Sequence, residues 1–289
     1  MYSSHKLILG TVQLGIDYGI NNLIGKQSYR ENLEILNYAY ENGILYLDTA
    51  AAYGDAETLI GNFHKQYPSK IFKVITKFHD EDIIDNFGNT LEKISVSRLF
   101  SYMFHQFLDT KNNAIVNYLI SLKKIDKIEN IGVSIYTNEE FEEAIELEYV
   151  DIIQIPYNLL DNSNKRLSLI KKAKDKNKKI HVRSVFLQGL FFTQTDSLPI
   201  KLRPLEKYIK QINAIAENYN IDKHELALQY VIFNKYIDGV IIGVDNLNQL
   251  KDNIKLGNQN LPIIYKEIFK KIDNINVEEE ELLNPTNWK

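Results

Sequence analysis

Residues 44–49, ILYLDT, form an apolar run that ends at a carboxylate, Asp48. Residues 73–78, KVITKF, repeat the pattern, because a second apolar run rich in β-branched residues ends beside Lys77. Continuous apolar runs of this length, without polar alternation, are typical of parallel strands that are covered on both faces. The two stretches therefore predict two buried parallel strands whose ends carry polar side chains.

Six more runs of this kind make a series of eight along the chain. Amphipathic segments with helical spacing separate them, most clearly at 28–43, 138–149 and 164–178, and a further periodic segment at 263–275 follows the last run. The other six runs are KLILGT (6–11), LFSYMFH (99–105), NIGVSI (130–135), VDIIQIPY (150–157), KIHVRSVF (179–186) and GVIIGV (239–244).

Eight strands that alternate with helices, without a linker-like change in composition, predict one α/β domain: a (β/α)₈ TIM barrel over residues 1–289. The alternative is an open doubly wound sheet. It is disfavoured because the early glycines do not form G-x-G-x-x-G and no Walker A sequence is present. Within the barrel, we expect 188–205 to form a lid loop and 257–289 to form a C-terminal helix and tail.

The composition narrows the possible partners. A net charge of −4 provides no global positive field for nucleic acid or an anionic membrane. No apolar run approaches the ~18 residues of a membrane span, and the N-terminal residues do not resemble a secretory signal. The absence of cysteine excludes disulfides and fits a reducing compartment. We therefore expect a soluble, cytoplasmic protein without nucleic-acid or membrane partners; no feature predicts a particular oligomeric state.

Polar residues recur at the ends of the predicted strands. In a TIM barrel the functional residues lie at the carboxyl ends of the strands, so residues at this repeat should converge on one pocket. The repeat is about 29 residues long, and the residues are Asp48, Lys77, His105 and Ser134, with Gln154 and Ser184 at comparable places in the next two strands.

Asp48, Tyr53, Lys77 and His105 together could carry out proton transfer. A free tyrosine has a pKa near ~10, and an ammonium beside its oxygen would lower that pKa. A histidine could orient the proton, and Asp48 could serve as the counter-ion of a desolvated Lys77. Such a set would protonate an oxygen that is becoming an alkoxide, as carbonyl reduction by hydride transfer requires.

Each of the four residues also has a structural interpretation when taken alone. Asp48 could cap the next helix, and Tyr53 could be an aromatic residue of the rim, since the chain has 18 tyrosines. Lys77 could point to solvent, and His105 could be a core histidine. Their coincidence at successive strand ends favours the catalytic interpretation.

Seven segments, in order along the chain from residue 6 to about 256, are similar to the aldo-keto reductases. LDTAAAYGDAETLIG (47–61) resembles their D-T-A-x-x-Y-G-x-x-E-x-x-x-G segment, VITKF (74–78) their lysine strand and YMFHQF (102–107) their histidine strand. The later segments, which are similar to their cofactor-binding strands, are GVSIY (132–136), IIQIPYNLLD (152–161), RSVFLQGLF (183–191) and GVIIGVDNLNQLKDN (239–253).

The resemblance implies an oxidoreductase that uses NADPH or NADH to reduce a small-molecule carbonyl substrate, namely an aldehyde, a ketone or a sugar-like compound. Tyr53 would be the general acid, with Asp48, Lys77 and His105 as its partners. The implied cofactor residues are Ser134 and Gln154 at the nicotinamide carboxamide, Ser184, Leu187 and Gly189 along the pyrophosphate, and Gly243, Val244, Asp245, Asn246, Gln249 and Asn253 at the adenosine end.

The chain also departs from the family's pattern. Arg183 lies where many members stack an aromatic ring on the nicotinamide; its guanidinium could stack there or bind an anionic substrate. Ile135 replaces a common asparagine. Asp245 would repel a 2′-phosphate and could accept from a ribose hydroxyl, which favours NADH. Candidate substrate-contacting residues are Tyr18, Tyr136, Tyr157 and Trp288, of which Trp288 could instead pack the tail on the barrel.

Two other function classes remain as alternatives. The first is a catalytically weak, nicotinamide-binding regulatory protein of the same fold, against which the intact set of four residues argues. The second is a metal-dependent hydrolase, which would need a cluster of ligands. The six histidines are scattered and His-x-His is absent, so we expect no metal site.

Overall fold

The first strand, β1 (Leu7–Gly10), pairs with both β2 and β8, so the sheet closes on itself. The structure is a computed structural model and describes residues 6–22, 25–78 and 83–288. The strands follow one another around the closed barrel in chain order, and every pair is parallel. The other strands are β2 (Tyr46–Asp48), β3 (Lys73–Phe78), β4 (Leu99–Phe104), β5 (Ile128–Ser134), β6 (Ile152–Pro156), β7 (Lys179–Arg183) and β8 (Gly239–Ile242).

This architecture confirms the predicted single-domain (β/α)₈ barrel. All eight predicted runs contain a strand. Six of the observed strands are shorter than predicted, by up to three residues at an end, whereas β3 matches its run and β5 begins two residues earlier. The seventh strand ends at Arg183 because Ser184 has a φ of 59°, in the left-handed region, which an extended strand cannot include. The strand ends that carry the predicted site are therefore fixed by backbone conformation as well as by pairing.

Two apolar layers hold the barrel together. A small cluster fills its interior and consists of Ile8, Ile75, Met103, Ile152 and Ile241. A much larger cluster lies between the outer faces of the strands and the helices. Burial on both faces explains why the strands read as continuous apolar runs rather than as alternating ones.

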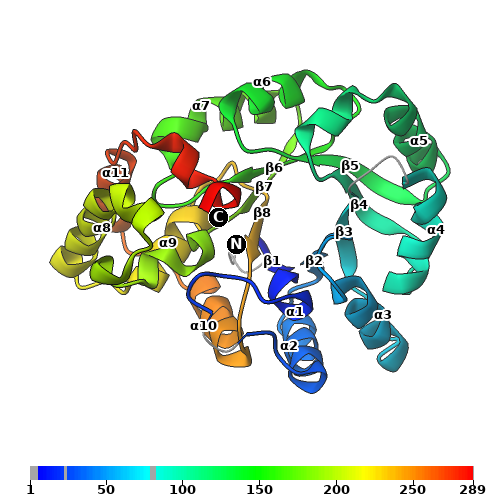
Figure 1. The fold of residues 1–289 in the computed structure, drawn as a ribbon, viewed down its shortest axis with the longest axis horizontal. Helices are drawn as coiled ribbons and strands as arrows, with labels where there is room; N and C mark the ends of the chain where they lie inside the picture. The colour runs from blue at the N-terminus through cyan, green and yellow to red at the C-terminus, as the bar shows by residue number, and fades with distance from the viewer. Residues whose placement is uncertain (1–5, 23–24, 79–82, 289) are drawn as a thin grey trace.

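The helices form an outer ring around the strands (Figure 1). Capping boxes begin two of them, at Ser28 with Glu31 and at Thr137 with Glu140, and satisfy backbone N–H groups at the helix ends. Within the described ranges, no helix has the length and apolar character needed to cross a membrane. The helices are α1 (Val12–Gly15), α2 (Tyr29–Glu41), α3 (Ala56–Gln66), α4 (Ile83–Ile94), α5 (Asn113–Lys124), α6 (Asn138–Glu146), α7 (Ser163–Asp175), α8 (Glu206–Tyr219), α9 (Lys223–Ile232), α10 (Leu247–Gly257) and α11 (Tyr265–Asp273).

The connection from β7 to β8 is the longest in the barrel. The predicted lid loop at 188–205 is not a structureless loop: it contains the short 3₁₀ helices η3 (Leu187–Phe192), η4 (Thr195–Ser197) and η5 (Ile200–Leu205), before α8 and α9. Several apolar side chains anchor it in the core, which explains why it is structured: Leu190, Phe191, Leu198, Leu202 and Leu205.

The C-terminal segment packs against the outer core cluster through Leu282, Leu283 and Trp288. After α11 it forms the 3₁₀ helices η6 (Glu280–Leu283) and η7 (Pro285–Trp288). The indole of Trp288 packs against the outer core cluster, and its Nε1 donates a hydrogen bond to the Leu282 carbonyl (2.8 Å). The structure therefore supports the interpretation of Trp288 as an anchor of the tail.

Candidate active site

A cavity of about 390 Å³ lies at the carboxyl ends of the strands, inside the ring of βα loops. Asp48, Tyr53, Lys77 and His105 all line it. These residues come from three successive βα units, and the closed parallel barrel brings their strand ends together. The convergence that the sequence predicts for these four side chains is thus present.

A buried ion pair forms the floor of the cavity. Lys77 Nζ lies 2.6 Å from Asp48 Oδ1, and the two side chains are only 2% and 5% exposed. The ammonium also donates to the Thr49 carbonyl (3.0 Å), and Gln154 Nε2 donates to Asp48 Oδ2 (2.7 Å). Removing two charges from water is costly, and these contacts offset the cost by satisfying both groups. Asp48 is therefore the counter-ion that Lys77 needs.

Tyr53 enters the cavity from the loop between β2 and α3. Its ring centroid lies 5.4 Å from Lys77 Nζ and 6.1 Å from the His105 ring, which it meets edge to face at 87°. The loop is held close to the first βα turn, since a Cβ at Gly15 would lie 1.9 Å from the Tyr53 carbonyl oxygen. A glycine at position 15 is thus required for Tyr53 to reach this place.

The protonation of Tyr53 differs from the sequence-based expectation. Burial of the hydroxyl, and next the Asp48 carboxylate, raise the pKa of Tyr53 above its ordinary value, whereas Arg183 opposes the rise. The ammonium of Lys77 does not reverse the rise, because it donates to Asp48 and its own pKa is lowered by burial. Tyr53 therefore keeps its proton at neutral pH instead of being shifted toward the phenolate.

Arg183 lies on the opposite wall of the cavity. Its guanidinium carbon sits 4.0 Å from the centroid of the Tyr136 ring, in a cation–π contact. Its nitrogens donate to Ser134 Oγ (3.3 Å), Ser184 Oγ (3.4 Å) and the Ile135 carbonyl (3.0 Å). The carboxyl ends of β5 and β7 are thus joined through this one side chain.

The segment after β7 has an unusual backbone. Its residues connect to the loop after α1: the Gln188 carbonyl accepts from Ile20 N–H (3.2 Å), and Gln188 Nε2 donates to the Tyr18 hydroxyl (3.0 Å). Left-handed conformations of non-glycine residues are strained and concentrate at functional sites. Positive φ angles occur at Ser184 (59°), Leu187 (45°), Gln188 (55°) and Gly189 (86°).

The turn from β8 into α10 supplies the far end of the cavity. Two of the predicted cofactor residues do not line it. Val244 is buried in the core, 1% exposed, and Asn246 caps α10 by accepting from Gln249 N–H (3.0 Å). The predicted cofactor residues that do line the cavity are Ser134, Gln154, Arg183, Ser184, Leu187, Gly189, Gly243, Asp245, Gln249 and Asn253.

Tyr157 does not lie in the cavity either. Its ring stacks on Tyr230 (centroids 5.4 Å apart, 10° between planes), and its hydroxyl bonds Ser163 Oγ at 2.6 Å. It is therefore a core residue beneath α7 and α9, not a substrate contact. Of the other predicted substrate residues, Tyr18 and Tyr136 line the cavity, and Trp288 is not among its lining residues.

Several polar residues that line the cavity escaped the sequence analysis, among them Gln13, His224 and Asp252. Gln13 follows the end of β1, so the repeat of polar residues at strand ends could have identified it. His224, on α9, bonds Asn253 Oδ1 through Nε2 (2.7 Å). Asp252, on α10, lies within the segment 239–253 that resembles a cofactor-binding strand, but the sequence analysis assigned it no role. His224 left no local signal, because its distance from the strand ends breaks the repeat.

Two buried oxygens in the cavity wall lack a hydrogen-bond partner among the described residues: Gln154 Oε1 and Gln13 Oε1. A buried acceptor without a partner is costly in a folded protein unless a ligand or water satisfies it. Gly243 leaves room beside Gln13, since a Cβ there would lie 2.3 Å from Gln13 Nε2. Each of the two oxygens could accept a hydrogen bond from a polar donor group in the cavity.

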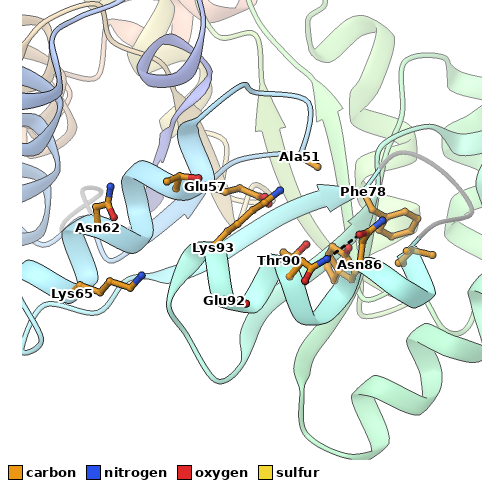
Figure 2. A pocket seen from close by; sticks show the side chains of 13 residues that line it. Ala51, Glu57, Asn62, Lys65, Phe78, Asn86, Thr90, Glu92 and Lys93 are labelled. Carbon is orange, nitrogen blue, oxygen red and sulfur yellow. Dashed lines mark hydrogen bonds between the residues drawn. The ribbon is translucent and has the colours of Figure 1, made fainter.

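A second cavity, of about 540 Å³, lies between α3 and α4, outside the barrel (Figure 2). Glu57, 4% exposed, borders it and accepts from Thr76 Oγ1 (2.7 Å). Burial raises the pKa of Glu57, and the nearby Lys93 opposes this rise.

In the described parts of the chain, no group of three or more His, Cys, Asp or Glu side chains could hold a metal ion.

Curated proteins similar to this chain carry the names of oxidoreductases. The chain is 25% identical over 177 residues to an aldo-keto reductase of Gibberella moniliformis (strain M3125 / FGSC 7600); this match covers 56% of the chain and about half, 53%, of that relative. It is 24% identical over 260 residues to aldo-keto reductase str7 of Strobilurus tenacellus (79% and 76% covered). It is also 24% identical over 286 residues to D-arabinose 1-dehydrogenase of Saccharomyces cerevisiae (strain ATCC 204508 / S288c), with 82% and 84% covered.

The fold and the sequence model agree with these similarities. The structure superposes on an aldo-keto reductase from Bacillus halodurans in its holo form with a TM-score of 0.75, at 20% identity, over 95% of this chain and 94% of that chain. The model of the Aldo/keto reductase family matches residues 6–276, nearly the whole chain. The chain therefore belongs to the aldo/keto reductase family, and it shares the (β/α)₈ fold of the superposed structure.

Proposed function

We propose that this protein reduces an aldehyde or ketone by hydride transfer from a nicotinamide cofactor, with Tyr53 as the proton donor. The observation that carries the proposal is the buried Asp48–Lys77 ion pair beside Tyr53 and His105 in one cavity of the barrel. The name of the yeast relative, D-arabinose 1-dehydrogenase, makes a sugar-derived carbonyl the first candidate substrate.

The surroundings of Tyr53 suit a proton donor. Its raised pKa keeps the hydroxyl protonated until the carbonyl oxygen gains negative charge. The Lys77 ammonium and the His105 ring then lie where they can stabilise the phenolate that remains after proton transfer. Asp48, oriented by Gln154, keeps Lys77 charged in a buried position.

A bound nicotinamide would supply the hydride. The unpartnered Gln154 Oε1 and the Ser134 hydroxyl are suited to its carboxamide. We assign Ser184, Leu187 and Gly189 to the pyrophosphate, and Gly243, Asp245, Gln249 and Asn253 to the adenosine end.

We further propose that NADH is preferred over NADPH. Asp245 and Asp252 both line the β8–α10 end of the cavity. Among the described lining residues, the lysine and arginine side chains are Lys77 and Arg183, which come from β3 and β7. A 2′-phosphate at the β8–α10 end would thus meet two carboxylates and no lysine or arginine, whereas a ribose hydroxyl could donate to one of the carboxylates.

The test follows the absorbance of NADH and NADPH with a panel of aldehydes, ketones and sugars. We expect turnover of at least one carbonyl compound, and a fall in kcat of about 10²- to 10⁴-fold in Tyr53→Phe. Tyr40→Phe, which removes a hydroxyl on α2 outside the cavity, is the matched control. Wild-type rates in Tyr53→Phe would exclude Tyr53 as the acid. Nucleotide binding without any turnover would instead favour the regulatory alternative.

A further inference from the structure

The cavity contains one cation whose charge no described carboxylate balances. Lys77 is paired with Asp48, but Arg183 donates only to uncharged acceptors: two hydroxyls and a carbonyl. No ion pair of Arg183 exists among the residues that the structure describes. Arg183 thus brings one net positive charge to the wall formed by β5 and β7.

The guanidinium of Arg183 is held in a fixed orientation and still has hydrogen-bond donors that are not in use. Tyr136 supports one face of it at 4.0 Å, and the three hydrogen bonds occupy Nε and one N–H on each terminal nitrogen. One N–H on each terminal nitrogen remains, because a guanidinium has five. A planar fork of this kind matches the two oxygens of a carboxylate or phosphate, and its orientation is already determined before a ligand arrives.

Arg183 also lies close to the reacting centre. It lines the same cavity as Tyr53 and Tyr18, and its charge lowers the pKa of both hydroxyls, opposing the effect of burial. An anion bound to Arg183 would therefore lie beside the proposed proton donor. Asp245 and Asp252 occupy the other end of the cavity, where an anionic substrate would be repelled. This distribution of charge gives an anionic substrate one favourable orientation.

We infer that the preferred substrate is a carbonyl compound that carries a carboxylate or phosphate, and that Arg183 binds this anionic group beside Tyr53. The inference rests on the function proposed above and names the substrate class of the same site. The pyrophosphate of the dinucleotide offers the same chemistry to a guanidinium. The experiment therefore has to separate the substrate's anion from that of the cofactor.

The test compares aldehydes that carry an anionic group with neutral analogues: 4-oxobutanoate with its methyl ester, 4-formylbenzoate with its methyl ester, and glyceraldehyde 3-phosphate with glyceraldehyde. In at least one pair we expect the wild-type kcat/KM to favour the charged member by about tenfold or more, mainly through KM. The ratio should fall to near one in Arg183→Met and be partly kept in Arg183→Lys, which retains the charge. Arg98→Met is the matched control, because Arg98 pairs with Asp126 and Glu129 just before β4, at the opposite end of the barrel.

The second part of the test measures the affinity of the wild type and of Arg183→Met for NADH by fluorescence titration. If Arg183→Met weakens NADH binding and lowers kcat/KM equally for both members of each pair, Arg183 serves the pyrophosphate and the inference is wrong. It is also wrong if the wild type reduces the uncharged members as well as, or better than, the charged ones in every pair. If the protein reduces only uncharged carbonyl compounds, the inference is wrong but the proposed function is supported. If it reduces no carbonyl compound at all, both the inference and the proposed function are wrong.

Discussion

Burial sets the protonation of several side chains in and around the barrel. It raises the pKa of Tyr53 and lowers that of Lys77, each through loss of water around the charged form. The same effect acts on His181, a β7 residue that faces the barrel interior between Gln154 and Gly239. His181 is 4% exposed, its Nδ1 lacks a partner among the described residues, and burial lowers its pKa to about 4.

His181 should make the fold sensitive to acid. Its pKa falls from 6.5 to about 4 on folding, so the unfolded chain binds the proton more readily between these values. The stability it lends is therefore fully present above about pH 6.5 and is lost as the pH falls toward 4, by at most about 3 kcal/mol. Urea unfolding at pH 7, 5.5 and 4.5 would measure this.

His181→Leu should lose less unfolding free energy between pH 7 and 4.5 than the wild type, because no buried imidazole then has to be protonated. His64, whose pKa is also lowered by burial, keeps its own contribution in both proteins. An equal pH dependence in the variant and the wild type would contradict the assignment to His181.

At the scale of elements, the turn between β8 and α10 has two roles: it caps the N-terminus of α10, and it places polar residues in the cavity wall. Successive residues of this turn point to opposite sides. Gly243 and Asp245 therefore line the cavity, whereas Val244 between them lies in the core. Asn246 then caps the helix. Asp245 is held in place by Gln249, whose Nε2 donates to its carboxylate (3.2 Å). The turn therefore presents an oriented carboxylate.

Asp245→Ser should weaken the proposed preference for NADH. Like charges a few ångströms apart repel by about 1–4 kcal/mol depending on their exposure to water, so the ratio of Kd(NADPH) to Kd(NADH) should fall by about fivefold or more. Adding Asp252→Asn should lower the ratio further. Fluorescence titration gives both constants, and Glu217→Gln, an exposed change on α8, is the control. An unchanged ratio in the double variant would show that these carboxylates do not select the nucleotide.

At the scale of the whole molecule, the C-terminal tail ties together segments that are distant in sequence. Tyr208 on α8 donates to Glu279 (2.8 Å) and accepts from Glu278 N–H (3.0 Å), and Lys165 on α7 forms an ion pair with Glu280. Trp288 then packs on the outer core. The tail thus stabilises the ring of helices that supports the rim.

Trp288→Ala should destabilise the protein without impairing its chemistry. Removing a half-buried indole that also donates to the Leu282 carbonyl should cost about 1–3 kcal/mol. Urea unfolding followed by far-UV circular dichroism would measure it, because the sequence contains no other tryptophan to report by fluorescence. Ile263→Ala, at an 82% exposed position, is the control. A fall in kcat/KM at unchanged stability would place Trp288 at the substrate after all.

The sequence predicted the fold because the signals for it are local and repeated. Apolar runs alternating with amphipathic segments specify strands and helices, and consecutive parallel strands joined by helices favour a closed barrel. Once the barrel closes, residues at strand ends must meet. Asp48, Lys77 and His105 could therefore be grouped from their spacing alone, and Tyr53 from its motif.

Only the tertiary structure decided which way the remaining side chains point and what surrounds them. Gln154 lines the cavity whereas Tyr157, three residues on, lies on the opposite face and packs on Tyr230, because successive side chains of a strand alternate. The raised pKa of Tyr53 and the unbalanced charge of Arg183 depend on neighbours from distant strands. Sequence spacing thus determined which backbone positions meet, whereas burial and partners, which are non-local, determined the chemistry available there.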